Sequence, residues 1–283
     1  MLFSILIANY NNGNFFKDCY NSIIAQTYIN WEVIIVDDCS TDDSVPIIKL
    51  LIDGDSRFRF YCNEVNKGCG YTKRRSAELA KGEIAGFVDP DDAILKNALE
   101  IMAHTHKQMP NISLIHSSFY YCDDSLNTLS RFQIAEAINV SEKFTNLDGK
   151  VTHFVSFKTS LYKKTEGIDA NLQRAVDQDL YLKLSEVGPF HFIDKPLYKY
   201  RLHKNGISTA CYSKAFYCHL KAIGMTEIRR GVNLEDEVVA YLKYKATQQY
   251  FESNYSNSRF LVRRLLSNIK NHPIAFVKGL IKK

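Results

Sequence analysis

Apolar residues along the chain follow two patterns that alternate with each other. Short apolar runs predict buried strands at Phe3–Ala8, Trp31–Val36, Arg57–Tyr61, Ile84–Val88, Ile112–Tyr121, Phe154–Phe157, Phe190–Ile193 and Leu197–Leu202, with Pro196 separating the last two. Apolar residues at helical spacing predict helices at Phe16–Ile23, Ile47–Ile52, Tyr71–Lys81, Leu95–Met102 and Val176–Val187. A capping box of Ser40 and Asp43 is expected to start the second helix. Strands that alternate with helices predict an α/β fold with a Rossmann-like, mainly parallel sheet flanked by helices.

Polar residues follow the first four predicted strands at the point where each strand ends. They are Asn9, Asp37 with Asp38, Asn66 with Lys67, and Asp89 with Asp91. Ligands of open α/β sheets lie outside the carboxyl ends of the strands, so these residues are expected at one binding edge. A Gly-x-Gly-x-x-Gly sequence does not follow the first strand, which argues against a dinucleotide site.

The fourth strand ends in three carboxylates within four residues, Asp89, Asp91 and Asp92. Clustered carboxylates repel one another, which favours a nearby cation or proton donor. The same residues could instead begin a helix as a solvated acidic turn. The convergence of four polar strand ends favours the first interpretation.

Composition narrows the class of protein. With 283 residues and 46% apolar content, the chain can bury a substantial core. Its seven cysteines are scattered without a Cys-x-x-Cys pair, which favours a reducing cytoplasm over a disulfide framework or a cysteine zinc site. The N-terminus lacks the basic region of a signal peptide and no long apolar segment follows, so we expect a cytoplasmic protein without a membrane span.

The net charge of +5 is concentrated in the C-terminal tail. After Glu252 the chain has no acid and seven bases, Arg259, Arg263, Arg264, Lys270, Lys278, Lys282 and Lys283. Without these seven charges the first 252 residues carry −2, which argues against a nucleic-acid partner. The bases alternate with apolar residues, so the tail is expected either to contact the inner face of a membrane or to pack on the protein or on a second subunit of an oligomer.

Six segments, taken in order, resemble the family 2 glycosyltransferases, which have the GT-A fold. They are Ser4–Asn11, Trp31–Ser40, Asn66–Gly68, Lys81–Asp92, Asp177–Leu180 and Tyr200–His203. The resemblance covers residues 1–208, which we expect to form the nucleotide-sugar-binding and catalytic domain. Residues 209–283 are expected to form a C-terminal helical extension with the basic tail.

The resemblance implies roles for residues at the strand ends. Asp38, with Asp37 beside it, is expected to bind the uracil of a UDP-sugar. The alternative is that one of these two acids serves only as a helix cap. The resemblance also places Ala8 and Asn9 at the base, Asn66 among the nucleotide-sugar residues, and Asp89 near the ribose. Asp91 of the Asp-x-Asp signature is expected on a Mn²⁺ or Mg²⁺ ion, which offsets the charge of the departing diphosphate.

The resemblance identifies Asp177 as the base that takes the proton of the acceptor hydroxyl. The alternative is that Asp177 and Asp179 only stabilise a helix N-terminus. His203 is expected to approach the metal or the diphosphate, or to be structural. The cluster Lys73–Arg75 departs from the family pattern, and we expect either Lys73 or Arg74, but not both, to bind phosphate.

With these residue roles, the resemblance implies an inverting, metal-dependent glycosyltransferase. The resemblance implies transfer from a UDP-sugar to a hydroxyl of a cell-surface polysaccharide or lipid-linked glycan precursor. Two rivals are a haloacid-dehalogenase-like phosphohydrolase, in which Asp89 would be the nucleophile, and a magnesium-dependent nucleotide-binding or receiver module. The phosphohydrolase would carry its motif at the first strand, whereas Asp89 follows the fourth, and it leaves the other strand-end acids unexplained. A pure binding module has no use for Asp177 and His203.

Overall fold

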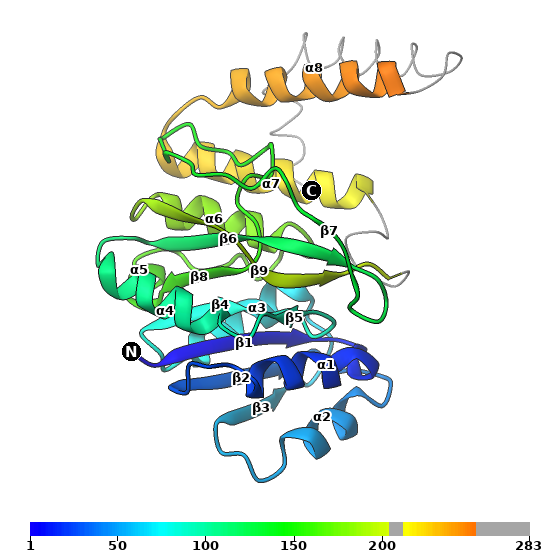
Figure 1. Cartoon of the computed structure of the whole chain (residues 1–283). Helices are drawn as coiled ribbons and strands as arrows, with labels where there is room; N and C mark the ends of the chain where they lie inside the picture. The colour runs from blue at the N-terminus through cyan, green and yellow to red at the C-terminus, as the bar shows by residue number, and fades with distance from the viewer. Residues whose placement is uncertain (204–211, 253–283) are drawn as a thin grey trace.

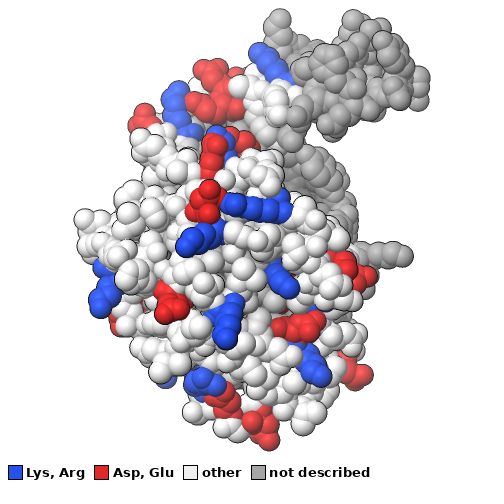
Figure 2. Space-filling model, in the orientation of Figure 1, with Lys and Arg blue, Asp and Glu red and all other residues white. Residues whose placement is uncertain are grey.

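The computed structural model describes residues 1–203 and 212–252. The predicted boundary at residue 208 and the seven bases of the tail lie outside these residues. None of the described helices is long and apolar enough to cross a bilayer. Over the described part of the face shown in Figure 2, acidic and basic side chains are interspersed and form no continuous basic patch.

Nine strands form one sheet with helices on both faces (Figure 1). The strands are β1 Phe3–Asn9, β2 Trp31–Asp37, β3 Phe58–Cys62, β4 Ile84–Phe87, β5 Ala93–Ile94, β6 Leu114–Cys122, β7 Thr128–Arg131, β8 Val155–Lys158 and β9 Phe190–Arg201. The helices are α1 Gly13–Ile24, α2 Ser44–Ile52, α3 Cys69–Leu79, α4 Ala98–Gln108, α5 Thr159–Tyr162, α6 Val176–Ser185, α7 Tyr212–Arg230 and α8 Glu235–Glu252.

The strand order is β3-β2-β1-β4-β8-β6-β9-β5, and β7 pairs with β6. The first four strands in this order are parallel, as the alternation of strands and helices predicts. The second half of the sheet is mixed, because β8 runs antiparallel to both β4 and β6, whereas β9 runs parallel to β6. The α/β fold class is confirmed, and the parallel half places three polar strand ends side by side.

Alternate residues of the central strands point into two separate cores. Ile5 and Ile7 face α1, α2 and α4 through Phe16, Ile48 and Leu99. Leu6, on the opposite face of β1, shares a core with residues of α3, α6 and α7. This second core extends to Leu234, directly before α8, and to Val238 and Leu242 within α8. The helical extension therefore packs on the sheet domain through these residues.

Two local predictions were wrong. Ser40 does not cap α2, which begins at Ser44; its hydroxyl donates a 2.6 Å hydrogen bond to Asp37, because the Asp37 carboxylate lies directly beside it. Pro196 does not separate two strands, because it lies inside β9 at a shift in register opposite Ser118. A bulge tolerates a residue that has no N–H to donate. Residues 125–146, which carry no readable pattern in the sequence, contain β7 and no other helix or strand.

Candidate active site

The polar strand ends line one pocket of about 400 Å³ at the carboxyl edge of the parallel strands. Nine of the eleven candidate residues line it: Ala8, Asn9, Asp38, Asn66, Lys73, Asp89, Asp91, Asp177 and His203. They come from the ends of β1, β2, β4 and β9, from the loop before α3, and from the N-terminal halves of α3 and α6. The structure therefore brings together residues that lie as far apart in the chain as Ala8 and His203. Asp37 and Arg74 are not part of the lining.

Asp38 holds the loop that walls one side of the pocket. Its carboxylate accepts hydrogen bonds from the backbone N–H groups of Lys67 (2.8 Å) and Gly68 (2.7 Å) and from the side chain of Asn63 (2.7 Å). Asp37 lies beneath it, fully buried, and accepts a 2.7 Å hydrogen bond from the Asn9 amide. Asp38 is thus the acid at the pocket surface, whereas Asp37 supports the strand ends from within.

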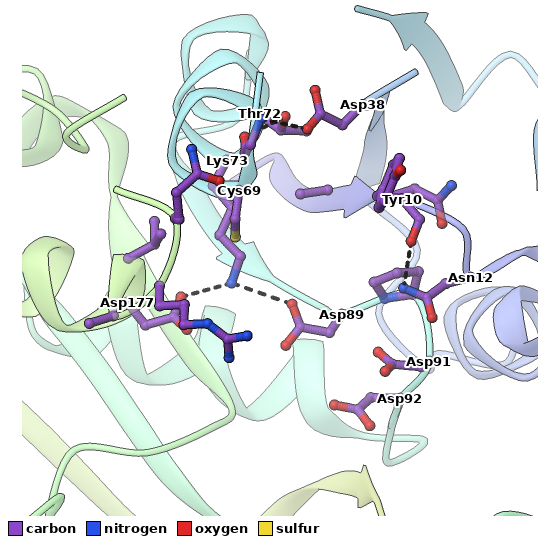
Figure 3. Close-up of a pocket in the computed structure, with 18 of the residues that line it drawn as sticks. Tyr10, Asn12, Asp38, Cys69, Thr72, Lys73, Asp89, Asp91, Asp92 and Asp177 are labelled. Atoms are coloured by element: carbon purple, nitrogen blue, oxygen red, sulfur yellow. Dashed lines mark hydrogen bonds and ion pairs between the residues drawn. The ribbon is translucent and has the colours of Figure 1, made fainter. Parts of the chain in front are cut away.

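Lys73 connects two acids from different parts of the chain (Figure 3). Its Nζ lies 2.8 Å from the Asp177 carboxylate and 3.4 Å from that of Asp89, and its side chain is only 6% exposed. Burial alone lowers the pKa of Lys73, but the charges of Asp177 and Asp89 outweigh it and raise the pKa well above its ordinary value. The ammonium group is therefore permanently charged between the two carboxylates.

Asp177 lies in the first turn of α6, and its side chain is 34% exposed to the pocket. Burial raises the pKa of Asp177, but Lys73 and then His153 oppose it, and the net effect lowers the pKa below its usual range. Asp177 is ionised at neutral pH and can accept a proton. The residue before the helix, Ala175, has a left-handed backbone with φ of 55°.

A close approach of two backbones fixes the position of α6 relative to α3. The N–H of Gly70 donates a 2.9 Å hydrogen bond to the carbonyl of Leu172, in the loop that leads into α6. A Cβ at Gly70 would lie 2.4 Å from the carbonyl oxygen of Asp169 and 2.5 Å from that of Leu172. Only glycine fits there, and the close contact holds the segment carrying Asp177 against the helix carrying Lys73.

The three carboxylates after β4 lie on the other side of Lys73 from Asp177 (Figure 3). Nε2 of His203 lies 2.8 Å from Oδ2 of Asp91, and the His203 side chain is 5% exposed. Burial, and then the neighbouring charge of Asp89, raise the pKa of Asp91. Burial followed by the charges of Asp91 and Asp89 raises the pKa of Asp92 well above its usual value. The loop thus concentrates negative charge that a cation would relieve.

Arg74 is directed away from the pocket, on another side of α3. Its guanidinium pairs with Glu78 at 2.8 Å and donates to the carbonyl of Ile168. Successive helical residues point about 100° apart, so Lys73 and Arg74 cannot face the same side. Of the two bases, only Lys73 lines the pocket.

Replacing Lys73 by Met is expected to lower the free energy of unfolding by about 1–3 kcal/mol. This loss is smaller than the loss on breaking a fully buried ion pair, because the carboxylates of Asp89 and Asp177 stay partly hydrated. The pKa of Asp177 should rise, since the larger of the two opposing charges is removed. Urea denaturation measures the first effect. The matched control is Arg74→Met, which should stay within about 0.5 kcal/mol of wild type. Equal destabilisation by both variants would contradict the bridge.

Three residues at the site carried no clear signal in the sequence. Tyr10 lines the pocket directly after β1. Arg201 lines it at the end of β9, with its side chain 1% exposed. The ring of Phe15 in α1 packs against that of His203, tilted by 57°, with ring centroids 4.7 Å apart. Phe15 does not fall at the helical spacing of Phe16, Cys19 and Ile23, so that spacing gives it no role.

The lining suits a divalent cation. It carries five carboxylates, Asp38, Asp89, Asp91, Asp92 and Asp177, against three permanently charged bases, Lys73, Arg174 and Arg201. Asp91 Oδ2 and His203 Nε2 are 2.8 Å apart, close to the separation of about 3 Å expected for adjacent ligands of an octahedral ion. No cluster of three or more His, Cys, Asp or Glu side chains converges among the described residues. The protein would therefore supply two ligands, which leaves positions for diphosphate oxygens and water.

Comparison with known sequences identifies relatives among polysaccharide synthases. A chondroitin synthase of Escherichia coli is 31% identical over 231 residues, which cover 82% of this chain and 33% of that protein. A hyaluronan synthase of Pasteurella multocida is 27% identical over 245 residues, which cover 82% of this chain and 24% of the synthase. The chain spans a third or less of the length of these two relatives.

Comparison with solved structures identifies the same fold. TarS from S. aureus in complex with UDP superposes with a TM-score of 0.67 at 19% identity, over 90% of this chain and 73% of that one. The mannosyltransferase PcManGT from Pyrobaculum calidifontis, in complex with GDP-Man and Mn²⁺, superposes with a TM-score of 0.56 at 12% identity, over 99% of this chain and 83% of that one. The expected GT-A fold is confirmed. The sequence profile described as glycosyl transferase family 2 matches residues 4–165, more than half of the chain, and the protein belongs to this family.

Proposed function

We propose that the protein is an inverting, metal-dependent glycosyltransferase that uses a UDP-sugar. The observation that carries this proposal is the division of the pocket by Lys73. Asp91 and His203 lie on one side, and an ionised carboxylate, Asp177, lies on the other. The leaving group needs its negative charge offset, and the nucleophile needs its proton removed. Asp91 and His203, through a cation, would meet the first need, and Asp177 would meet the second.

In the proposed reaction, Asp177 takes the proton of an acceptor hydroxyl as its oxygen attacks the anomeric carbon. The bond between that carbon and the diphosphate breaks in the same displacement, and the configuration of the sugar inverts. A divalent cation held by Asp91 and His203 would offset the negative charge of the diphosphate. Lys73, between Asp89 and Asp177, adds a fixed positive charge on the path of the departing group.

The pocket lining and the relatives support the proposed donor and acceptor. Asp38 and Tyr10 line the end of the pocket at the strand ends β1 and β2, where a uracil would lie. The relatives named as chondroitin and hyaluronan synthases support a glycan acceptor, and the TarS complexes with UDP and with UDP-GlcNAc support a UDP-sugar donor. We propose a polysaccharide or lipid-linked precursor as the acceptor. The comparisons give no support to a phosphohydrolase or a receiver module.

All proposed donor, metal and base residues lie within residues 1–203. We therefore keep residues 1–208 as the proposed catalytic domain and residues 209–283 as the helical extension. Contact of the basic tail with the inner face of a membrane remains a proposal from sequence alone.

A panel of nucleotide-sugars tests this function. Release of the nucleotide, UDP, GDP or CMP, is measured for UDP-, GDP- and CMP-sugars with Mn²⁺, with Mg²⁺ and with EDTA, in the presence of oligosaccharide acceptors. We expect turnover with a UDP-sugar and metal, loss of turnover in EDTA, and a product whose anomeric configuration, read by NMR, is inverted. Turnover that is unaffected by EDTA, or a retained configuration, would refute the mechanism. Asp91→Asn should abolish the metal response, whereas Asp43→Asn, an exposed acid outside the pocket, should not.

A further inference from the structure

Arg201 connects three segments of the chain that meet beside the acidic loop. Its Nε donates a 2.6 Å hydrogen bond to the backbone carbonyl of Asp91, and its Nη2 lies 2.7 Å from the carboxylate of Asp18 in α1. Nη1 donates to the backbone carbonyl of Asp124, in the turn after β6. The backbone N–H of Arg201 donates a 2.7 Å bond to the carboxylate of Asp92. One residue thus fixes both the main chain at Asp91 and the side chain at Asp92.

Helix α1 supplies the other half of this arrangement. The ring of Phe15 lies 4.7 Å from the guanidinium carbon of Arg201 and also 4.7 Å from the ring centroid of His203. Phe15 and Asp18 are three residues apart, so they share one face of the helix. Asp18 is half exposed, with 49% of its side chain accessible, and contributes a charge partner for Arg201 from the rim of the pocket. The helix therefore contacts both Arg201 and His203 without lying between them and Asp91.

We propose that Arg201, Phe15 and Asp18 form a brace that positions Asp91 and His203 for a divalent cation. This inference rests on the proposed function, because it presumes that a cation binds between Asp91 and His203. The brace acts through the ligands: Arg201 fixes the main chain that carries Asp91, and Phe15 fixes the plane of the His203 ring. Partners of metal ligands that fix their orientation typically affect metal affinity by 10- to 100-fold.

The side chain at position 201 needs the geometry of arginine. The three acceptors bonded by its side chain lie on three different segments, and a planar guanidinium presents five N–H donors in a fixed fork. A lysine carries the same charge on a single nitrogen and cannot reach all three acceptors at once. Arg201→Lys leaves the backbone bond to Asp92 in place, so it removes only the contacts of the fork.

The test measures the binding of Mn²⁺ in the presence of UDP, by calorimetry and by the EPR signal of free Mn²⁺. Arg201→Lys is expected to weaken Mn²⁺ binding by about 10-fold or more. Asp18→Asn and Phe15→Leu, which each remove one contact of the brace, are expected to weaken it by roughly 3- to 10-fold. The matched control is Asp43→Asn, which makes the same change of charge as Asp18→Asn on an exposed side chain that does not line the pocket.

Thermal unfolding of every variant separates positioning from stability, and binding is measured well below the lowest midpoint. Weaker Mn²⁺ binding by folded variants supports the brace. Binding within about twofold of wild type for all three variants overturns it, even if Arg201→Lys lowers the unfolding temperature. If Arg201→Lys does not fold, Asp18→Asn and Phe15→Leu decide the question. Absence of Mn²⁺ binding by the wild-type protein would instead overturn the proposed function, and the brace with it.

Discussion

Replacing Asp177 by Asn is expected to lower the rate of sugar transfer by about 10²–10⁴-fold, the usual contribution of a general base. Asparagine has nearly the same shape as aspartate but cannot accept the proton of the acceptor hydroxyl. UDP and Mn²⁺ should still bind, because Asp177 lies across Lys73 from Asp91 and His203. Single-turnover transfer, with calorimetry of UDP and Mn²⁺ binding in parallel, distinguishes loss of the base from loss of the donor site.

Asp179 provides the matched control, since it lies in the same first turn of α6. Its buried carboxylate accepts the N–H of Asp169 at 2.8 Å and pairs with Lys183 at 2.9 Å. It therefore holds the loop before the helix, whereas Asp177 bonds to Lys73 and faces the pocket. Asp179→Asn should lower the free energy of unfolding by roughly 3 kcal/mol and leave transfer by the folded protein nearly unchanged. Wild-type turnover in Asp177→Asn would refute its role as the base.

The sequence predicted the parallel half of the sheet and the residues at its edge for one physical reason. A buried parallel strand is a short apolar run, and its end is marked by the first polar residues, so Asn9, Asp38 and Asp89 could be located without a structure. The expected role of Asp177 as the base needed the family resemblance in addition. Spacing alone could not place α6 next to α3, because that contact depends on the close approach at Gly70.

The antiparallel half and the surroundings of the metal residues could not be predicted in the same way. Strand β9 pairs with β6 on one side and β5 on the other, and neither partner is adjacent in sequence. Arg201 depends on this pairing, because its partners Asp18 and Asp91 come from distant segments. The choice between Lys73 and Arg74 likewise required the orientation of α3 relative to the pocket. Two adjacent bases are equivalent in a sequence, but they point to different sides of a helix.

Acidification toward about pH 5 is expected to lower the free energy of unfolding, because histidines that are neutral in the folded protein bind protons in the unfolded chain. Three histidines have lowered pKa values, and two of them, His106 and His116, are almost fully buried. Burial lowers the pKa of His106 to about 3 and those of His116 and His219 to about 4. All three are neutral in the folded protein, whereas the unfolded chain binds protons below its ordinary histidine pKa of about 6.5. Stability is therefore complete above about pH 6.5 and falls toward the folded values of 3 to 4.

The loss at about pH 5 amounts to roughly 2 kcal/mol for each histidine, or roughly 6 kcal/mol in all, which is comparable to the whole stability of many domains. The raised pKa values of Asp91 and Asp92 act in the opposite direction, because those carboxyls bind protons more readily in the folded protein. Urea denaturation between about pH 5 and pH 7.5 should show a steep loss of stability toward the acid end.

His116 offers the sharpest variant, because its ring is fully buried and neither ring nitrogen has a hydrogen-bond partner among the described residues. His116→Leu removes both the titration and the unsatisfied nitrogens, so it should stabilise the protein at low pH and flatten the acid slope by about a third of the three-histidine effect. His104→Leu is the control, since His104 is exposed on α4. An acid slope equal to that of wild type in His116→Leu would show that His116 is not held neutral by burial, and that the acid sensitivity arises elsewhere.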